Sequence, residues 1–482
     1  MSSAAMAKDN PVQRLRSILT EMPYCSGTLD VKPSDLALYY GKGDQARHID
    51  LSKATTVDLD KLAEACGPSP FGRNDETVFD ESYRRARQME PDEFKLAFDV
   101  ERAGLMEVVR SYLLHGSEEE RFIKAELYKL NVYGKDSFFK SHQDTPRANN
   151  MFGSLVIALP TPHQGGELVL RHKDHEWTFD SGALLSGPGA SSRIAFVSFF
   201  SDVEHEVLPV ESGHRLTATY NLYFSPTRTV YSTPPSTALR ILQPSGAVTS
   251  TVSSALAALL ADPRILPKGG TLGFGLQHQY PLPKAWTVWD ANPLDALQGW
   301  LKGSDAALFR ACTEHGLTPL LRLVYEEQDG PVTAVLCTEA IQPVESKEDD
   351  DGLTMVCAEG KGEVMFRRPL LADGTQMSTE GPSGYIQRFS ERWRWEDGQG
   401  DHLASRTVDM VTDIASFNEI KGTKVVHAGN GVETERMYMD VCLIVEVGPA
   451  GKRRNVDEIE EEPRSLRRDH GEDFVYERCH GW

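Results

Sequence analysis

The sequence predicts an α+β fold, with a block of antiparallel strands between a helical N-terminal lead-in and a second α+β domain. Short β-branched and aromatic runs, punctuated by Gly, Pro and Asp, fill residues 126–224 with no helical pattern between them. Apolar residues at helical spacing occur on both sides of this block. The length of 482 residues also exceeds what one hydrophobic core usually serves, so we expect two or more folding units.

The N-terminal segment, residues 1–120, is expected to form a mixed and then helical extension that packs on the strand-rich block. Apolar residues recur at helical spacing in DESYRRARQM (80–89) and in PDEFKLAFDVERAGLMEVVRSYLLHG (91–116). Pro91 stands where the second helix would begin and Gly116 where it would stop. We therefore predict helices over both segments.

Residues 121–226 are predicted to form a single core of eight strands. Short strands at this spacing, separated by turn residues, are typical of an antiparallel barrel or a double-sheet jelly roll. The expected strands cover residues 127–133, 137–143, 153–160, 166–172, 176–180, 194–200, 205–210 and 215–224.

A Pro/Ser/Thr-rich linker, SPTRTVYSTPPS (225–236), precedes the second α+β domain, which we place at residues 237–450. A tail of mixed charge, residues 451–482, follows it. Within the domain, helical spacing is found at 251–262 and 295–316, and strand-like runs at 319–327, 333–341 and 438–448.

Composition excludes several classes of protein. The formal net charge of −20 would repel a phosphate backbone, so nucleic acid is not an expected partner. The seven cysteines are scattered and never form CxxC, which argues against a disulfide framework and against a zinc site, and favours buried thiols. The N-terminus lacks a signal-like apolar stretch, and no window approaches about 18 uninterrupted apolar residues. We expect no membrane partner and a cytoplasmic or nuclear protein.

The stretch FFKSHQDTPRANN, residues 138–150, sets an imidazole and a carboxylate two residues apart at the end of a predicted strand. Side chains at positions i and i+2 of a strand point the same way, so His142 and Asp144 can share one metal ion. A non-haem iron(II) that activates oxygen is typically held by two imidazoles and one carboxylate, with the other positions open. The pair therefore suggests two of three iron ligands.

The third ligand must come from a strand that is distant in the sequence. His205 opens the seventh predicted strand, and an antiparallel core can bring that strand beside the HxD strand. Ten residues later, Arg215 and Thr217 share one face of the last strand. A guanidinium and a hydroxyl on one interior face offer a fixed fork for the far carboxylate of a small dicarboxylate.

An HxD pair, a late histidine and an Arg-x-Thr ten residues on resemble the iron(II)/2-oxoglutarate dioxygenase superfamily. The segments YGKDSFFKSHQDTPR, GGELVL and HEVLPVESGHRLT are most similar to its prolyl 4-hydroxylase-like branch. The resemblance covers about residues 126–224, roughly a fifth of the chain. A looser resemblance, to uncharacterised fungal proteins of this superfamily, names no substrate.

The resemblance implies a double-stranded β-helix in which His142, Asp144 and His205 hold Fe(II). It implies that 2-oxoglutarate chelates the iron and that Arg215 and Thr217 bind its far carboxylate. O2 and 2-oxoglutarate would be consumed, with succinate and carbon dioxide as products. Such hydroxylases often carry a cosubstrate-binding tyrosine three residues before the HxD histidine. This chain has Phe139 there, and we assign that role to Tyr133 or another residue.

A second HxD, formed by His172 and Asp174, is the alternative iron site. It lies in a Lys/Asp-rich hairpin with only two strands before His205, so we prefer the first pair.

The function we expect is hydroxylation of a protein or peptide side chain, with proline as one candidate. The alternatives are a small-molecule oxygenase and a non-catalytic scaffold on an oxygenase fold. An open groove at the mouth of the core would favour a polypeptide, and a closed apolar pocket would favour a metabolite.

Overall fold

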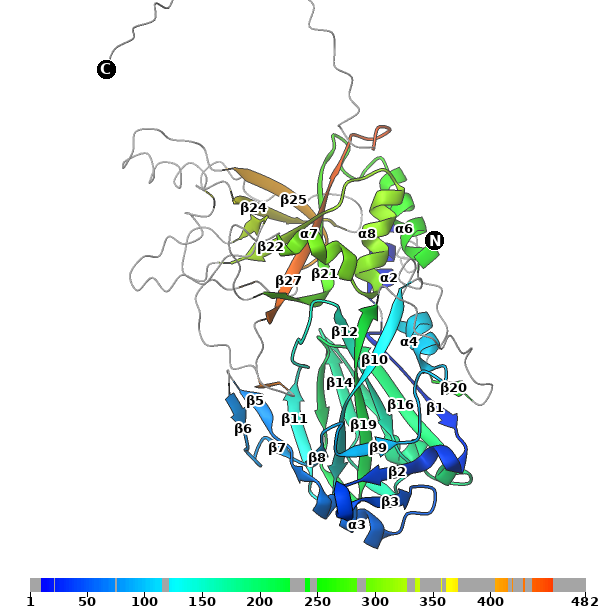
Figure 1. Ribbon diagram of the computed structural model, residues 1–482. Helices are drawn as coiled ribbons and strands as arrows, with labels where there is room; N and C mark the ends of the chain where they lie inside the picture. Colours follow the sequence, from blue (N-terminus) through cyan, green and yellow to red (C-terminus); the bar gives the residue numbers. More distant parts are fainter. Residues whose placement is uncertain are drawn as a thin grey trace, which may run out of the picture.

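Two strand-rich bodies are stacked end to end in the computed structural model (Figure 1). We call them the N-terminal body, built around two antiparallel sheets, and the C-terminal barrel, a closed barrel with helices beside it. The structure describes residues 10–20, 22–73, 76–114, 121–225, 239–242, 249–283, 292–326, 334–338, 357, 361–371, 404–414, 418, 428–429 and 436–453.

The N-terminal body consists mainly of an eight-stranded and a five-stranded sheet, paired antiparallel throughout. The larger sheet runs in the order β20 (Leu239–Ile241), β1 (Tyr24–Asp30), β16 (Arg193–Phe200), β12 (Met151–Ala158), β19 (Arg215–Ser225), β10 (Phe122–Tyr133), β8 (Arg87–Met89) and β4 (Gly67–Pro68). The smaller runs in the order β15 (His175–Phe179), β14 (Leu168–His172), β17 (Glu204–Val207), β11 (Phe138–His142) and β7 (Arg84–Arg85).

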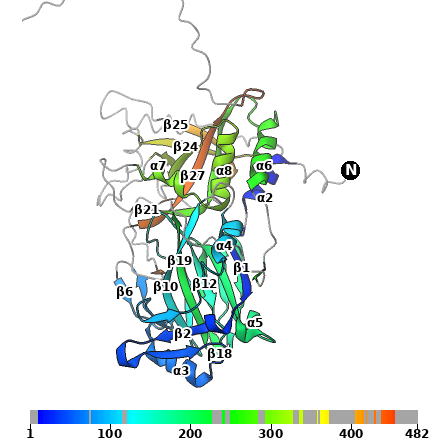
Figure 2. The same cartoon turned by 45° about the vertical axis from the view of Figure 1, so that its right-hand side comes forward.

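One hydrophobic core draws on both sheets, with Leu155, Phe196 and Leu222 from the larger and Leu170 and Phe139 from the smaller. Each of the eight predicted strands is present, so the prediction of an antiparallel core is confirmed. The two-sheet form decides between the alternatives, because the strands divide into two sheets in the manner of a jelly roll. Two short strands, β13 (His163–Gly165) and β18 (Val210–Gly213), pair at one end of the body, near α5 (Ser181–Leu184) (Figure 2).

The predicted helices between residues 80 and 116 are largely wrong. The first segment forms β7 and β8, and the second forms β9 (Phe94–Leu96) and turns before a helix appears as α4 (Leu105–Leu113). Strand β8 adds to the edge of β10, with Gln88 opposite Asn131, and β9 pairs with β2 (Ala37–Tyr40). Hydrogen bonds to these distant strands outweigh a weak local helical spacing.

The rest of the N-terminal extension is also mostly extended. Strand β3 (Arg47–Asp50) pairs with β2, and β5 (Phe71–Arg73) and β6 (Glu76–Val78) form a hairpin. Helix α3 (Thr56–Ala65) begins with a capping box between Thr55 and Asp58. Short strand β26 (Ala428–Gly429) pairs with β5, so a C-terminal segment reaches the N-terminal body.

A six-stranded barrel with helices beside it lies in the segment where the second α+β domain is expected. Its six strands are β21 (Gly270–Pro283), β25 (Ser405–Thr412), β24 (Gly362–Pro369), β23 (Val335–Cys337), β22 (Leu320–Tyr325) and β27 (Arg436–Val447), in order of pairing. The predicted helix at 251–262 is α6 (Thr249–Ala261). The one predicted at 295–316 divides into α7 (Pro293–Leu297), a short 3-10 turn at Gln298–Trp300 and α8 (Gly303–Glu314).

Helix α2 (Pro11–Leu19) joins the C-terminal barrel although it precedes β1 of the N-terminal body in the chain. It lies beside α6 (Figure 2) and packs on α6 and α8 through Val12, Leu15 and Leu19, which belong to the barrel's hydrophobic core. Both bodies are therefore tied by the N-terminal segment as well as by the linker after β19.

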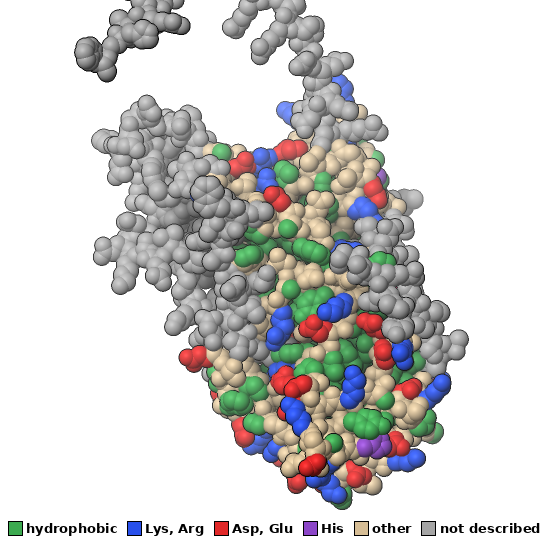
Figure 3. Space-filling model, viewed as in Figure 1, with side chains coloured by type: hydrophobic (Ala, Val, Ile, Leu, Met, Phe, Trp, Pro, Cys, Tyr) green, Lys and Arg blue, Asp and Glu red, His purple; other side chains and the backbone are tan. Residues whose placement is uncertain are grey.

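The described cysteines are buried free thiols, as predicted: Cys25, Cys66, Cys312, Cys337, Cys357 and Cys442. Cys479 lies outside the described residues. Basic and acidic side chains are interspersed over the described part of the face in Figure 3. Among the described helices, none has both the length and the apolar character that crossing a bilayer requires.

Leu15→Ala is expected to destabilise the protein by about 2–5 kcal/mol, because it empties a fully buried site in the barrel's core. Denaturant unfolding of the full chain measures this. Gln13→Ala, on the exposed face of the same helix, is the matched control and should change stability by less than about 0.5 kcal/mol. Equal effects of the two substitutions would show that α2 is not docked on the barrel.

Candidate functional site

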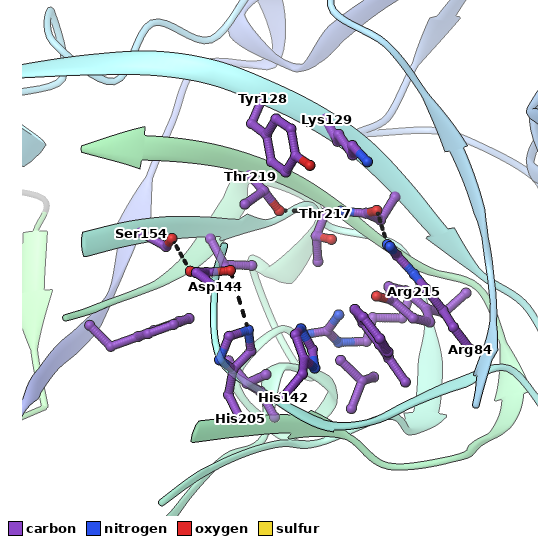
Figure 4. A pocket seen from close by; sticks show the side chains of 17 residues that line it. Arg84, Tyr128, Lys129, His142, Asp144, Ser154, His205, Arg215, Thr217 and Thr219 are labelled. Carbon is purple, nitrogen blue, oxygen red and sulfur yellow. Dashed lines mark hydrogen bonds and ion pairs between the residues drawn. The ribbon is translucent and has the colours of Figure 1, made fainter. Parts of the chain in front are cut away.

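A pocket with about 530 Å³ of empty space, partly open to solvent, lies between the two sheets of the N-terminal body. The smaller sheet contributes side chains from β7, β11, β14 and β17, and the larger contributes side chains from β10, β12, β16 and β19 (Figure 4). His142, Asp144, His205, Arg215, Thr217 and Tyr133 all line it. The structure thus brings together all six residues that the sequence singled out.

Three potential metal ligands converge on the smaller sheet's side of the pocket. His142 on β11 is the register partner of His205 on β17, so the pairing of these strands sets the two imidazoles side by side. Asp144 lies two residues after the end of β11, and its Oδ1 lies 3.7 Å from Nε2 of His205. The three side chains are buried, and their ligand atoms lie within 4.8 Å of one another. Two imidazoles and a carboxylate in this arrangement form a His-Asp-His triad.

Both imidazoles are oriented by the backbone. Nδ1 of His142 lies 2.8 Å from the carbonyl oxygen of Lys140, and Nδ1 of His205 lies 3.0 Å from that of Val203. Because a carbonyl oxygen can only accept, each Nδ1 is the protonated nitrogen and donates a hydrogen bond. Nε2 of each ring is therefore left to bind the metal. Burial, and then the neighbouring His205, lower the pKa of His142 well below its usual value, which favours the neutral ring that binds metal.

The carboxylate of Asp144 is oriented by Ser154 on β12, whose hydroxyl donates a hydrogen bond to Oδ2 (Figure 4). Sequence reasoning missed Ser154, because a single serine in an apolar strand carries no motif. The ring of Phe139 stacks on His142 at 3.6 Å between centroids, and Phe199 packs on His205 at 4.8 Å. The ligands are thus held by hydrogen bonds on one side and by aromatic rings on the other.

Arg215 and Thr217 lie at the start of β19, in the larger sheet, and both line the pocket. The Arg215 side chain is almost completely buried, and its Nε and Nη2 have no hydrogen-bond partner. Burial lowers the pKa of this guanidinium, and Tyr133 and Glu167 partly oppose that effect. A buried cation with two unpaired donors is costly unless an anion binds there, so this corner of the pocket is suited to a carboxylate.

Gly166 makes room for the Arg215 side chain. Its φ of +73° is a conformation that favours glycine, and a Cβ there would lie 3.0 Å from Cδ of Arg215 and 2.7 Å from Cγ2 of Val210. His214, the neighbour of Arg215, points away from the pocket and lies 3.3 Å from Asp60.

Tyr133 is the register partner of Arg215 across β10 and β19, and the guanidinium carbon lies 5.5 Å from its ring centroid. Phe139, at the position where related hydroxylases often carry a tyrosine, packs instead between His142 and the guanidinium of Arg84. Tyr133 is thus beside the proposed carboxylate site, whereas Phe139 supports the metal ligands.

Several polar residues of the pocket were not foreseen. Arg84 on β7 donates to Asn131 at 3.1 Å, and Asn131 donates to Thr219 at 3.2 Å. A register shift between Leu127 and Lys129 bulges β10, and Tyr128 and Lys129 both line the pocket. Arg84 lay in a segment read as helix, and a bulge leaves no signal in the strand's alternating pattern.

Burial, and then the positive charge of Arg84, lower the pKa of the Lys129 ammonium to about 8. Arg147 donates to the Tyr128 hydroxyl at 2.8 Å. It therefore acts on the pocket wall through Tyr128.

The second HxD does not form a site. Asp174 is exposed, and His172 instead meets Asp202 and His278, the second group of three ligand-type side chains among the described residues. Two features make this trio a poor cation site. The ammonium of Lys302 lies 2.8 Å from Asp202, and the rings of His172 and His278 are stacked at 5.2 Å instead of meeting edge to edge.

Comparison with known proteins gives a partial family match. Residues 128–223 match the 2OG-Fe(II) oxygenase superfamily. That segment spans β10 to β19 and contains all six candidate residues. No curated protein matches the chain.

Solved structures with some similarity include a prolyl-4-hydroxylase from Pseudomonas putida, at 18% identity over 44% of this chain and 98% of that one, with a TM-score of 0.26. Another is a Trichoplax adhaerens prolyl hydroxylase in complex with a peptide fragment of a hypoxia inducible factor. It is 15% identical over 46% of this chain and 94% of that one, with a TM-score of 0.24. A viral collagen prolyl hydroxylase from Paramecium Bursaria Chlorella virus-1 is 15% identical over 35% of this chain and 91% of that one, with a TM-score of 0.22.

The conclusion rests on the family match and on the geometry of the pocket. The matched segment supplies the triad, and the same pocket holds an unpaired buried guanidinium opposite it. Residues 128–223 are therefore a 2OG-Fe(II) oxygenase superfamily domain with a His-Asp-His facial triad, and the protein is an oxidoreductase that works with Fe(II) and 2-oxoglutarate.

Proposed function

We propose that the protein hydroxylates a side chain of a protein or peptide, with proline as one candidate residue, and that it does so as a member of the prolyl 4-hydroxylase-like branch. The observation that carries the reaction class is a single pocket that contains both the triad and the unpaired guanidinium of Arg215. The proposed substrate class rests on the polar groups in the remaining wall of the pocket.

The residues present fit Fe(II). His142 and His205 each have Nδ1 committed to a backbone carbonyl, so their Nε2 atoms serve the metal, and Asp144 adds an oxygen ligand. Bound Fe(II) would supply the oxygen activation that couples decarboxylation of 2-oxoglutarate to hydroxylation. The carbonyls of Lys140 and Val203 hold the two rings in orientation for that role.

The residues present also fit 2-oxoglutarate. Nε and Nη2 of Arg215 are the unpaired donors that a carboxylate would satisfy as a two-pronged hydrogen-bonded pair. Thr217 lies two residues along the same strand face, and Tyr133 lies opposite Arg215. We assign these three residues to the far carboxylate of the cosubstrate.

The substrate would occupy the remaining wall of the pocket. Tyr128 and Lys129 lie across from the triad, and Arg84 lies on a third side (Figure 4). A small apolar metabolite would be favoured by a wholly apolar lining, whereas this wall sets hydroxyl and cationic groups, which match the polar backbone of a polypeptide, beside the apolar side chains of the pocket. This polar wall is what favours a protein or peptide substrate.

A size-fractionated cell extract tests the substrate class. The protein, loaded anaerobically with Fe(II) and 2-oxoglutarate and then exposed to oxygen, is expected to release more succinate with the protein fraction than without it. Protease treatment of that fraction to single amino acids should remove the stimulation. Stimulation only by the low-molecular-mass fraction would establish a small-molecule oxygenase. Metal binding without any succinate release would establish a scaffold.

Replacing any triad residue with alanine is expected to abolish 2-oxoglutarate turnover while the fold is kept, because two ligands are too few to hold the metal. Asp144→Ala is the sharpest case, and Asp174→Ala in the second HxD is its matched control. Anaerobic Co(II) titration should detect no site in the first variant and an unchanged site in the second. The reverse result would move the iron to the second HxD.

Arg215→Lys is expected to weaken 2-oxoglutarate binding on the order of tenfold to a hundredfold, since losing a charge-assisted hydrogen bond costs about 1.5–3 kcal/mol. An ammonium offers a point charge where the site is built for a planar fork. Thr217→Val should have a smaller effect, because a neutral hydroxyl is lost. Anaerobic optical titration of the iron chelate measures both, and Fe(II) affinity is the internal control. Wild-type affinity in Arg215→Lys would place the carboxylate elsewhere.

A further inference from the structure

The C-terminal barrel contacts the two chain segments that carry the metal ligands. One segment is Gln143, which stands between His142 and Asp144. The other is the turn of Ser201 and Asp202, which precedes His205. Nothing in the oxygenase reaction requires the C-terminal barrel. Its contacts with these two segments therefore indicate what role it has.

The carboxylate of Asp202 is the centre of the junction. Its Oδ1 accepts from Nζ of Lys302 at 2.8 Å. Its Oδ2 accepts from the backbone N–H of Gln279 at 3.0 Å and lies 3.2 Å from Nδ1 of His278. These three partners all belong to the C-terminal barrel, on β21 and at the start of α8.

The Asp202 and Lys302 side chains are 0% and 1% exposed, so this ion pair is fully enclosed. Burial opposes the ionisation of Asp202, yet Lys302 and His278 hold the pKa of the carboxyl well below its usual value. The pair is therefore charged, and removal of one partner leaves the other as an unpaired buried charge.

The backbone of the same turn is also attached to the barrel. The side-chain amide of Gln143 donates to the carbonyl of Asp202 at 2.8 Å and lies 3.3 Å from the side-chain oxygen of Gln279. The hydroxyl of Tyr438, on β27, donates to the carbonyl of Ser201 at 3.0 Å. The segment between the first two ligands and the turn before the third thus meet at one surface of the barrel.

The turn connects this surface to His205. The N–H of Val203 donates to the carbonyl of Phe200 at 3.0 Å, which closes the turn around Asp202. The carbonyl of Val203 in turn accepts from Nδ1 of His205 and fixes the orientation of the ring. A shift of Asp202 would therefore move the oxygen that aims a metal ligand.

Strand β21 is shaped for this contact. Its register with β27 jumps between Gly275 and Gln279, which leaves residues 276–278 bulged out of the ladder. The carboxylate of Asp305 accepts from the N–H groups of Gln277 and His278 at 2.7 and 3.0 Å. The bulge is thus held in one conformation by the barrel itself, as a rigid surface for the turn.

We propose that the C-terminal barrel is a positioning element for the metal site, and that the Asp202–Lys302 pair sets the placement of the ligand segments. The proposal rests on the triad assigned above, but not on the identity of the substrate. Groups outside the ligand sphere that orient ligands typically change metal affinity about 10–100-fold when they are removed.

Lys302→Met in the full-length chain is the primary test, with Co(II) as the probe under anaerobic conditions. We expect Co(II) affinity to fall by about tenfold and the ligand-field bands of the bound ion to shift. The double variant Asp202→Asn with Lys302→Met removes the unpaired charge but does not restore the pair, so it should recover the unfolding temperature while the Co(II) affinity stays reduced. The thermal unfolding temperature of each metal-free variant is recorded beside the titration.

Lys173→Met is the matched control. Lys173 also crosses the junction, where its Nζ donates to the carbonyl of Leu276 at 3.2 Å, but it has no hydrogen bond to Asp202 or to the ligand segments. A purely structural role of the junction would lower the unfolding temperature in both lysine variants and leave Co(II) affinity unchanged in both. That result would overturn the proposal.

Gln143→Met covers the case in which Lys302→Met does not fold. It removes the amide that joins the HxD segment to the Asp202 turn, at a half-buried position without a buried charge. A several-fold loss of Co(II) affinity with an unfolding temperature close to that of Lys173→Met would support the proposal. Wild-type Co(II) affinity in folded Gln143→Met would overturn it. Loss of all Co(II) binding in Asp144→Ala, tested in parallel, shows that the site being measured is the triad.

Discussion

The pairing of β11 with β17 places His142 opposite His205, and the whole site depends on that register. Successive side chains of a strand point to opposite faces, so a slip by one residue would turn one imidazole out of the pocket. The register changes between Phe139 and His142, at the point where β11 ends and the chain carries Asp144 into the same space. An irregular strand end therefore converts a two-histidine pair into a three-ligand site.

This arrangement is costly before any metal binds. Two imidazoles, a carboxylate and a guanidinium are enclosed together, and Arg215 has donors without partners. The hydrophobic contacts between the two sheets offset this cost and keep the groups in place. Backbone carbonyls and Ser154 satisfy the atoms that do not face the centre of the pocket. What remains unsatisfied is complementary to a metal ion and a dicarboxylate.

The C-terminal barrel adds contacts outside the pocket that hold the N-terminal body in place. Helix α2 packs into the barrel's hydrophobic core, and the chain then crosses to β1 of the N-terminal body. A fully enclosed ion pair joins Asp202 to Lys302 across the two bodies. Because unpaired buried charges are expensive, such a pair favours one relative placement of the bodies over others. The oxygenase sheets and the barrel are in this sense one structural unit.

The sequence by itself determined the strands of the core, the HxD pair and the Arg-x-Thr pair, since the two-residue period of a strand shows which side chains share a face. It could not show which strands meet. The pairing of β8 with β10 and of β7 with β11 turned a predicted helix into strands, and the second pairing brought Arg84 to the pocket. Likewise, only the fold separated His172 from Asp174 and placed it beside Asp202 and His278. Local periodicity records the orientation of each side chain, whereas contacts between distant segments are decided by burial and hydrogen bonding in the assembled core.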